Sequence, residues 1–242
     1  QERFGTHFSL ALCLEDTIAD NHVAAAEQQL AATLFAILSA SEKKSFFLPK
    51  IFVRVRSPWQ IRHLTRSLGD GIRLLTGFIL PKFSMINVDA YLAAVTYANQ
   101  ELKRPVYFMP IMEDRSLLDL RIRHEHLYQL KEKLLTMEEL VLNIRAGGND
   151  LCHVFGFRRS QKESIHSIAA ISSVFSDLIT VFGTDFVMSG PVWEYYNGKH
   201  WKKGLKKELR EDRLCGFTGK TVIHPRQIEL VNDAYKVSGK DL

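Results

Sequence analysis

The chain has 242 residues, of which 46% are hydrophobic and 24% charged, with a formal net charge of +5 at neutral pH. This balance indicates a globular protein with a full core, and its apolar runs are shorter than the roughly 20 residues that cross a bilayer. The three cysteines are widely spaced without a C-x-x-C motif, which argues against a disulfide framework and a zinc site and favours the cytoplasm.

Short apolar runs alternate along the chain with longer amphipathic segments. We expect strands, rich in apolar and β-branched residues, at 8–16, 50–58, 77–83, 105–114, 140–144, 185–193 and 220–225. Helices are expected between and after them, at 20–40, 59–68, 87–103, 116–135, 164–183, 199–213 and 226–237. The first of these helices is expected to begin with Asp20 or Asn21 as its cap.

This alternation indicates an α/β fold with a parallel sheet covered on both faces. Seven strand–helix units in a chain of about 250 residues favour a (β/α)₈ TIM barrel over an open doubly wound sheet. No G-x-G-x-x-G motif is present to support a dinucleotide-binding fold. Because no Gly/Ser/Pro-rich linker interrupts the pattern, we expect residues 1–242 to form one barrel domain.

Charged residues end most of the expected strands. They are Glu15 and Asp16, Arg54 and Arg56, Lys82, Glu113 and Asp114, Asp150, and His224. In a barrel these strand ends lie on one rim, which is where active sites are built. For His224 the simpler alternative is a cap or turn made together with Pro225.

Three of these residues, Asp16, Glu113 and Asp150, are carboxylates on different strands that can converge on one point. A site of carboxylates without histidine or thiol suits Mg²⁺ or Mn²⁺. Arg54, on a neighbouring strand, has a guanidinium suited to a carboxylate or to a carbonyl that gains negative charge. Together these groups could stabilise an enolate, although each carboxylate alone could equally form a structural salt bridge.

The sequence resembles the citrate lyase beta-subunit proteins of the HpcH/HpaI aldolase superfamily, in order and nearly from end to end. The matching segments are CLEDTIAD (13–20), FVRVRS (52–57), GFILPK (77–82), MPIMED (109–114), AGGNDL (146–151), SGPV (189–192) and GFTGKTVIHPRQIELVNDAY (216–235). The last segment is long and specific, whereas each shorter one would be weak evidence alone.

The resemblance implies a Mg²⁺-dependent lyase on a (β/α)₈ barrel that splits or joins small hydroxy acids or their CoA thioesters. By this resemblance Glu113 and Asp150 bind the metal, and Arg54 orients and polarises the substrate carbonyl. The resemblance also implies that Glu15 and Asp16 contact water bound to the metal, and that one of the two accepts a proton. Substrate-binding positions are implied at Lys82, Gly148 and Pro191. The family further implies a homo-oligomer, trimeric or hexameric.

Several positions depart from the family pattern. Residues 1–7 supply no counterpart of the family's first strand and its substrate-binding arginine, so we expect the first strand–helix unit to be absent or abbreviated. Ser189 replaces the aspartate of a D-G-P motif, and Asn149 replaces a glutamate. An insertion at 194–201 adds aromatic residues and lysine. With these departures the chain resembles a divergent branch of the family, of the kind found in stress-response gene clusters, more than citrate lyase itself.

Two alternatives to a lyase remain open. The chain could be a non-catalytic descendant that binds an acidic ligand or a protein inside a stress-response complex. Alternatively, the lysine-rich segment 199–213 could bind nucleic acid, although its interleaved acids are more typical of a solvated helix face. Nothing in the sequence indicates a membrane partner, and the favoured partner is a small carboxylate or acyl-CoA substrate.

Overall fold

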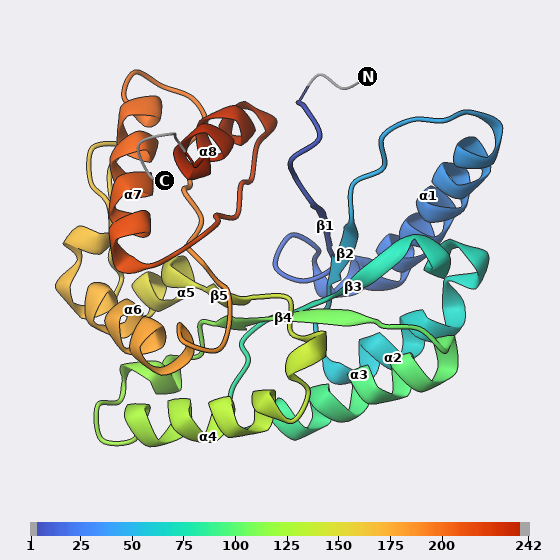
Figure 1. The fold of residues 1–242 in the computed structure, drawn as a ribbon, viewed down its shortest axis with the longest axis horizontal. Helices are drawn as coiled ribbons and strands as arrows, with labels where there is room; N and C mark the ends of the chain where they lie inside the picture. Colours follow the sequence, from blue (N-terminus) through green and yellow to red (C-terminus); the bar gives the residue numbers. More distant parts are fainter. Residues whose placement is uncertain (1–3, 238–242) are drawn as a thin grey trace. The chain divides into compact units, whose positions relative to one another are not determined.

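Parallel strands joined by helices make up the fold, as the sequence predicts. The computed structural model describes residues 4–237, which divide into two compact units. The first unit is the chain up to Pro110 together with Glu139–Leu142, and the second is Ile111–Glu138 and the chain from Asn143 onward. The strands pair in sequence order and every pairing is parallel (Figure 1).

The strands are short, and most coincide with the apolar runs of the sequence. Their bounds are Leu10–Cys13 (β1), Ile51–Arg54 (β2), Leu75–Leu80 (β3), Tyr107–Met112 (β4), Ile144–Ala146 (β5) and Met188–Ser189 (β6). Strand β4 serves both units, because its first four residues pair with β3 and its last two pair with β5. The register at its second half is Ile111↔Arg145 and Met112↔Ala146.

Helices follow the strands along the chain. Their bounds are Val23–Lys43 (α1), Pro58–Ser67 (α2), Val88–Leu102 (α3), Arg123–Leu135 (α4), Gly148–Val154 (α5), Ala169–Phe182 (α6), Trp201–Cys215 (α7) and Ile228–Tyr235 (α8). Short 3₁₀ turns precede helices at Asp20–His22, Arg115–Leu118, Ile165–Ser167 and Pro225–Gln227, and precede strands at Gly69–Leu74 and Glu138–Leu140.

The first unit buries β2 and most of β3 on both faces, whereas no residue of β1 is buried. In β2, Ile51, Phe52 and Val53 are all nearly inaccessible to solvent, as expected for a parallel sheet covered by helices. Gly77 in β3 allows the close approach of β4, since a Cβ at this position would lie 2.0 Å from the Tyr107 carbonyl oxygen. Residues 4–9, which precede β1, contain no strand.

The second unit has a core of its own between its short strands and helices α4 to α8. The most apolar helix is α6, which buries six side chains: Ile171, Val174, Phe175, Leu178, Val181 and Phe182. A second cluster joins α7 to α8 through Trp193, Trp201, Leu205, Leu209 and Val231. This packing supports the loops that follow β5 and β6.

Three sequence predictions were wrong in detail. Residues 140–142 are only half-buried and lie outside β5, because Glu138–Leu140 forms a 3₁₀ turn and the strand starts at Ile144. The expected strand at 220–225 is reduced to one parallel bridge between Gly190 and Lys220. Helix α1 begins after His22, which has no capping side-chain bond, instead of after Asp20 or Asn21.

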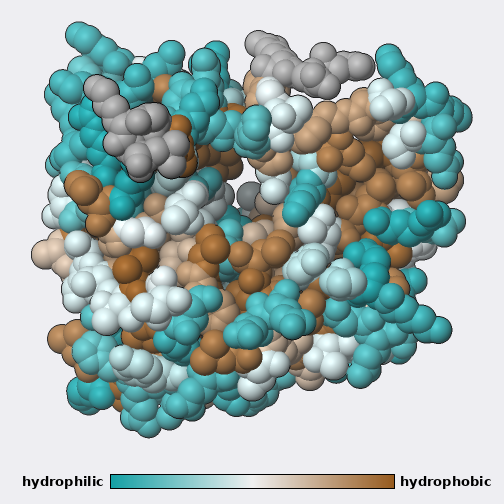
Figure 2. Space-filling view, in the orientation of Figure 1, coloured by the Kyte–Doolittle hydropathy of each residue, from teal (hydrophilic) through white to brown (hydrophobic). Residues whose placement is uncertain are grey.

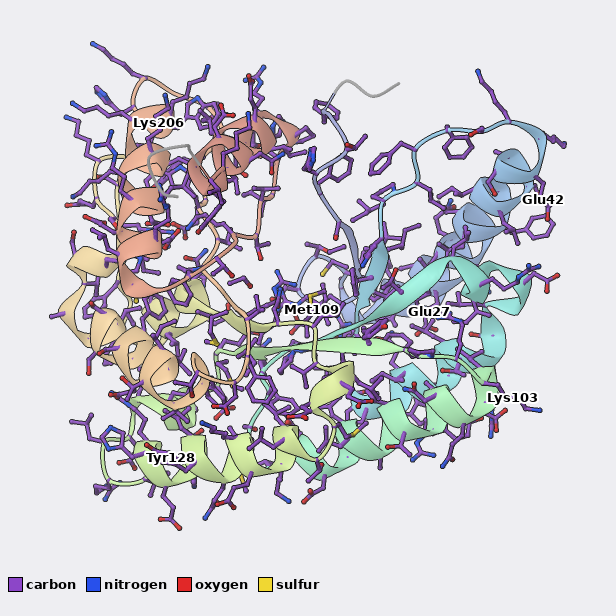
Figure 3. All side chains as sticks on the ribbon, in the orientation of Figure 1. Glu27, Glu42, Lys103, Met109, Tyr128 and Lys206 are labelled. Carbon is purple, nitrogen blue, oxygen red and sulfur yellow. The ribbon has the colours of Figure 1, made fainter. Side chains whose placement is uncertain are left out.

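Helix α1 is largely exposed, and Leu30 and Leu34 are its only buried residues. In residues 4–237, the segment Asp20–Lys43 alone is long and apolar enough to cross a membrane, and 11% of that window is buried. Figure 2 shows apolar side chains at the surface in this region, and Phe35 is 59% exposed. The helix is nevertheless attached to α2, because Glu27, labelled in Figure 3, accepts a 2.6 Å hydrogen bond from Gln60 and lies 3.3 Å from His63.

Candidate active site

Four charged side chains from three strand ends meet in the first unit. Glu15 and Asp16 follow β1, Arg54 ends β2, and Lys82 follows β3. The Arg54 Nη2 atom lies 2.5 Å from Glu15 Oε2 and 2.9 Å from Asp16 Oδ2. The Lys82 Nζ atom lies 2.5 Å from Glu15 Oε1 and 3.3 Å from Asp16 Oδ1. The structure therefore brings together four of the residues that the sequence singled out, and we call them the strand-end cluster.

The charges of the strand-end cluster stabilise one another. Burial opposes ionisation of Asp16, but hydrogen bonding with Glu15 and the charges of Arg54 and Lys82 outweigh it, so the pKa of Asp16 is lowered. Burial likewise opposes the charge on Lys82, but its hydrogen bond and ion pairs with the two acids raise its pKa. Asp16 and Lys82 are accordingly both charged at neutral pH.

Local backbone structure fixes the position of Lys82. Its φ is +48°, in the left-handed region that residues with a Cβ seldom adopt. Asn87 holds this turn, because its Nδ2 donates to the Lys82 carbonyl at 2.9 Å and its Oδ1 accepts from the Ser84 amide at 3.0 Å. Backbone strain of this kind is often found at functional sites.

Arg56 holds the loop that carries the two acids, a role that the sequence analysis missed. Its Nε donates to the Leu14 carbonyl at 2.7 Å and its Nη2 to the Glu15 carbonyl at 3.2 Å. Its Nη1 lies 2.5 Å from Asp20. Arg54 therefore pairs with the acid side chains, whereas Arg56, two residues further on, holds the backbone of their loop. The R-x-R spacing was visible in the sequence.

The two expected metal ligands lie in the second unit. Glu113 comes directly after β4 and is buried, and Asp150 lies in the first turn of α5, four residues after the end of β5. The Gly147 amide donates to the Met112 carbonyl at 3.1 Å, which extends the pairing of the two strands. A Cβ at Gly147 would lie 2.3 Å from the Glu113 Cβ and 2.5 Å from its Oε2. Glycine at 147 thus leaves the space that the Glu113 carboxylate occupies.

The donor chemistry of this pair fits a hard divalent cation. No cluster of three or more His, Cys, Asp or Glu side chains suited to a metal is found among residues 4–237. Two carboxylates with the remaining positions left to water and substrate are typical of Mg²⁺ sites in enzymes. A structural zinc site would instead require four nitrogen or sulfur ligands. The residues present therefore fit Mg²⁺ or Mn²⁺.

Gly148 and Pro191, the other two expected substrate positions, are both buried and lie close to each other. A Cβ at Gly148 would meet Ile165 Cδ1 at 2.4 Å, Phe175 Cζ at 2.8 Å and Pro191 Cβ at 3.2 Å. These contacts account for both residues by packing. Substrate contact at either position stays a prediction.

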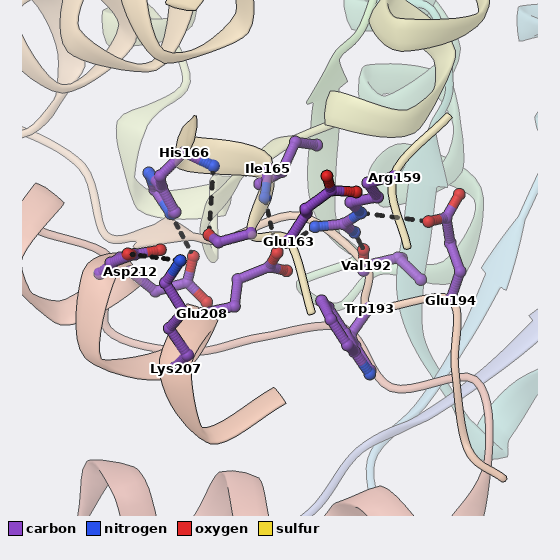
Figure 4. A network of polar contacts seen from close by, with 12 residues as sticks. Arg159, Glu163, Ile165, His166, Val192, Trp193, Glu194, Lys207, Glu208 and Asp212 are labelled. Atoms are coloured by element: carbon purple, nitrogen blue, oxygen red, sulfur yellow. Dashed lines mark hydrogen bonds and ion pairs between the residues drawn. The ribbon is translucent and has the colours of Figure 1, made fainter. Parts of the chain in front are cut away.

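A buried network of charges supports the second unit, and the sequence analysis did not anticipate it (Figure 4). Lys220 Nζ lies 2.9 Å from Glu208 Oε1 and 2.7 Å from Asp212 Oδ2, and Arg159 forms an ion pair with Glu208. His166 Nε2 lies 2.7 Å from Asp212 Oδ1. We call these five residues the buried network.

The buried network also contacts the chain that carries Asp150. Arg159 donates to the Val192 carbonyl at 2.6 Å, and its Nη2 lies 3.5 Å from the Oδ1 of Asn149. The network therefore links α7 to the loop after β6 and to the first turn of α5.

The lysine-rich helix α7 has two different faces. Lys202, Lys203, Lys206 and Lys207 are all exposed, as expected for a solvated helix face. Lys206 is labelled in Figure 3. On the other face, Glu208 and Asp212 are fully buried, so their interpretation as solvated acids was wrong. A signal was present, because these two acids share the i, i+4 spacing of Leu205 and Leu209.

His224 makes a cap, which confirms the simpler of its two interpretations. Its side chain accepts from the Arg226 amide at 3.1 Å, and the Gln227 side chain bonds back to the His224 amide. The three cysteines are free thiols, and burial raises the pKa of Cys152 to about 11.

Solved structures with the same fold come from several organisms. RipC from Yersinia pestis is 14% identical, with 96% of this chain and 91% of that chain covered and a TM-score of 0.65. The citrate lyase beta subunit from M. tuberculosis, solved with oxaloacetate and magnesium, is 19% identical, with coverages of 95% and 87% and a TM-score of 0.60. Malate synthase from Haloferax volcanii, solved with magnesium and glyoxylate, is 12% identical, with coverages of 95% and 66% and a TM-score of 0.71.

The family comparison covers the entire chain. No curated protein matches the sequence significantly. A family model described as C–C bond lyase of the TIM-barrel fold matches residues 1–242. This match confirms the predicted fold class and the resemblance to citrate lyase beta-subunit proteins. The chain belongs to the family of carbon–carbon bond lyases that have the TIM-barrel fold.

Proposed function

We propose that the protein is a Mg²⁺-dependent carbon–carbon lyase that acts on a small carboxylated hydroxy acid, free or as its CoA thioester. One observation carries the proposal: Glu113 and Asp150 follow two paired strands, with Gly147 leaving room for the Glu113 carboxylate. Family membership adds the reaction class. Relatives solved with magnesium and a keto acid support the choice of metal and substrate class.

Under this proposal, Glu113 and Asp150 hold the metal. The bound ion would supply Lewis-acid stabilisation to the oxygens of an enolate. Mn²⁺ could serve in place of Mg²⁺, because both prefer oxygen ligands. The two carboxylates would together offset the cation's charge.

The strand-end cluster has a separate task in this proposal. Arg54 orients the substrate carbonyl and stabilises the charge that develops on its oxygen, for which a guanidinium is well suited. Glu15 and Asp16 hold Arg54 in place, and one of them accepts a proton during the reaction. Lys82 forms ion pairs with both acids and helps to lower the pKa of Asp16.

We propose that residues 1–242 act as one barrel domain in a cytoplasmic homo-oligomer, trimeric or hexameric. The exposed apolar surface of α1, which includes Phe35, supports association between copies. Size-exclusion chromatography with light scattering tests this part. A monomer at micromolar concentration would contradict it.

Calorimetric titration of Mg²⁺ and Mn²⁺ tests the metal site directly. We expect saturable binding to the wild type, loss of binding in Asp150→Asn and Glu113→Gln, and tighter binding when oxaloacetate or pyruvate is added. Glu132→Gln is the matched control, because Glu132 is an exposed acid of the same unit. Turnover of hydroxy acids and acyl-CoA thioesters would then be screened with the loaded protein.

The outcome separates the lyase from a non-catalytic binding protein. Metal binding that needs Asp150, together with turnover of a hydroxy acid or thioester, supports the lyase. Absence of metal binding at millimolar concentration would reject the proposal and favour the binding protein. Steep loss of polynucleotide binding with salt, traced to Lys202 and Lys206, would instead favour the nucleic-acid alternative.

A further inference from the structure

Arg145 is a charged residue in the middle of the three-residue strand β5, between the buried residues Ile144 and Ala146. An arginine inside such a short strand requires a reason, because the neighbouring positions of parallel strands are usually apolar. Its side chain is half-buried. The sequence analysis did not single it out.

The strand register places Arg145 on the same face of the sheet as the expected metal ligand Glu113. Arg145 pairs with Ile111 of β4, and Glu113 lies two residues after Ile111. Side chains two residues apart along a strand point to the same face. Gly147, two residues after Arg145, supports this placement. A Cβ at Gly147 would meet Ile111 Cγ2 at 3.0 Å and would also meet the Glu113 side chain, so all four residues lie on one face.

Ser189 and Thr221 lie on this face as well. Ser189 of β6 pairs directly with Arg145. The next residue, Gly190, faces the other way, because a Cβ there would lie 3.1 Å from the Asp212 carboxylate. Lys220 forms a parallel bridge with Gly190 and faces the same way as Gly190, because its Nζ lies 2.7 Å from Asp212. The next residue, Thr221, therefore faces the same way as Ser189, and its hydroxyl accepts a hydrogen bond from Arg145 Nη2.

We propose that Arg145, with Ser189 beside it and Thr221 orienting its guanidinium, binds the carboxylate of the substrate. A guanidinium matches a carboxylate through two parallel hydrogen bonds, and the two hydroxyls add neutral hydrogen-bonding groups. The inference rests on the proposed function, which supplies a carboxylated substrate and a metal at Glu113 and Asp150. It adds the residue that would select carboxylated substrates over neutral ones.

Pyruvate and its neutral methyl ester are the probes, titrated calorimetrically at saturating Mg²⁺. We expect Arg145→Gln to weaken pyruvate binding by roughly 10- to 100-fold, the range for a lost charge-assisted hydrogen bond. Methyl pyruvate should bind the two proteins equally, and Mg²⁺ alone should bind both within about twofold. Arg121→Gln is the matched control, because Arg121 lies in the same unit and its side chain is 87% exposed.

Two further variants guard against a failure to fold. Arg145→Lys keeps the positive charge but loses the planar guanidinium that makes two parallel hydrogen bonds, so we expect an intermediate affinity for pyruvate. Thr221→Val removes only the hydroxyl that orients Arg145, and we expect a loss of several-fold. Thermal melting of each variant shows whether it is folded.

The outcomes distinguish this inference from the proposed function. Equal pyruvate binding by wild type and Arg145→Gln overturns the carboxylate site and leaves the metal-dependent lyase intact. If Arg145→Gln binds Mg²⁺ more tightly than the wild type but binds pyruvate equally, Arg145 is only a charge partner of Glu113 and Asp150. This outcome also overturns the carboxylate site. Pyruvate binding that requires Arg145 without any metal supports the site and rejects the metal dependence. No pyruvate binding to the wild type under either condition overturns the site.

Discussion

The strand-end cluster and the buried network both join carboxylates to one lysine and one arginine, yet they differ in solvent access. In the buried network the side chains of Glu208, Asp212 and Lys220 are 0% exposed. In the strand-end cluster Asp16 and Lys82 are each 49% exposed. A charge inside the protein depends on its protein partners alone, whereas a charge at the surface also has water.

This difference in solvent access suggests different tasks for the two groups of residues. Glu208 is bound by Lys220, by Arg159 and by the Ile165 amide at 2.9 Å, which leaves no role for a ligand. Asp16 and Lys82 face solvent, and a substrate can take the place of that water. We therefore expect the buried network to determine whether the second unit folds and the strand-end cluster to determine what the protein does.

The largest predicted effect follows from breaking the buried network. Lys220→Met leaves Glu208 and Asp212 without their shared cation, and removing one partner of a buried ion pair costs about 3–5 kcal/mol of stability. Urea denaturation followed by circular dichroism measures it. The control is Lys207→Ala on α7, the helix that carries Glu208 and Asp212. It breaks a partly exposed pair with Glu211 at 3.9 Å and should cost below about 0.5 kcal/mol. Equal losses in the two variants would contradict the distinction.

A smaller effect on stability, but a large one on activity, is predicted for Arg54. Arg54→Gln removes the cation that Glu15 and Asp16 position, so kcat/KM should fall by about 10²–10³-fold, as when a group that stabilises an oxyanion is lost. Its unfolding free energy should change by less than that of Lys220→Met, because Lys82 still pairs with both Glu15 and Asp16 and because Asp16 is half-exposed. Activity is measured on the substrate identified by the turnover screen. If Arg54→Gln is strongly destabilised but keeps its activity per folded molecule, Arg54 serves stability and not the reaction.

The smallest effect concerns the pH dependence of the pair formed by Asp16 and Lys82. The pKa of Asp16 is lowered from 3.8, so its contribution to stability is present above that value and is lost as pH falls through the lower folded pKa. The pKa of Lys82 is raised from 10.5, so its contribution is present below 10.5 and is lost as pH rises further. A double-mutant cycle with Asp16→Asn and Lys82→Met should therefore give a constant coupling between about pH 5 and 9. A coupling that changes within this window would show that another group titrates.

Much of the strand-end cluster could be predicted from the sequence, because its residues follow apolar runs whose ends lie at one edge of a parallel sheet. Lys82 and Glu15 are 67 positions apart, and only the shared strand direction connects them. Helix α5 was less predictable, since Gly147 and Gly148 resemble a loop when local preferences alone are considered. Its glycines are explained by the side chains packed against them.

Burial of charge was the other feature that local patterns did not reveal. Five lysines between Lys199 and Lys207 dominate the segment that contains α7 and obscure the spacing of Glu208 and Asp212. Burial of those acids depends on Lys220 and Arg159, which lie 8 to 49 positions away. Strand β6 lies within the strand predicted at 185–193, but its length of two residues was beyond prediction, because its ends depend on pairing with β5 and not on its own sequence.

Gly147 has a consequence for how this protein can vary. Any other amino acid would place its Cβ 2.3 Å from the Glu113 Cβ, an atom whose position is fixed by the backbone directly after β4. In a library carrying every amino acid at this position, selection for carbon–carbon cleavage should return glycine alone. Position 148, where the obstructing atoms belong to Ile165, Phe175 and Pro191 side chains, should regain tolerance when those neighbours are randomised together with it.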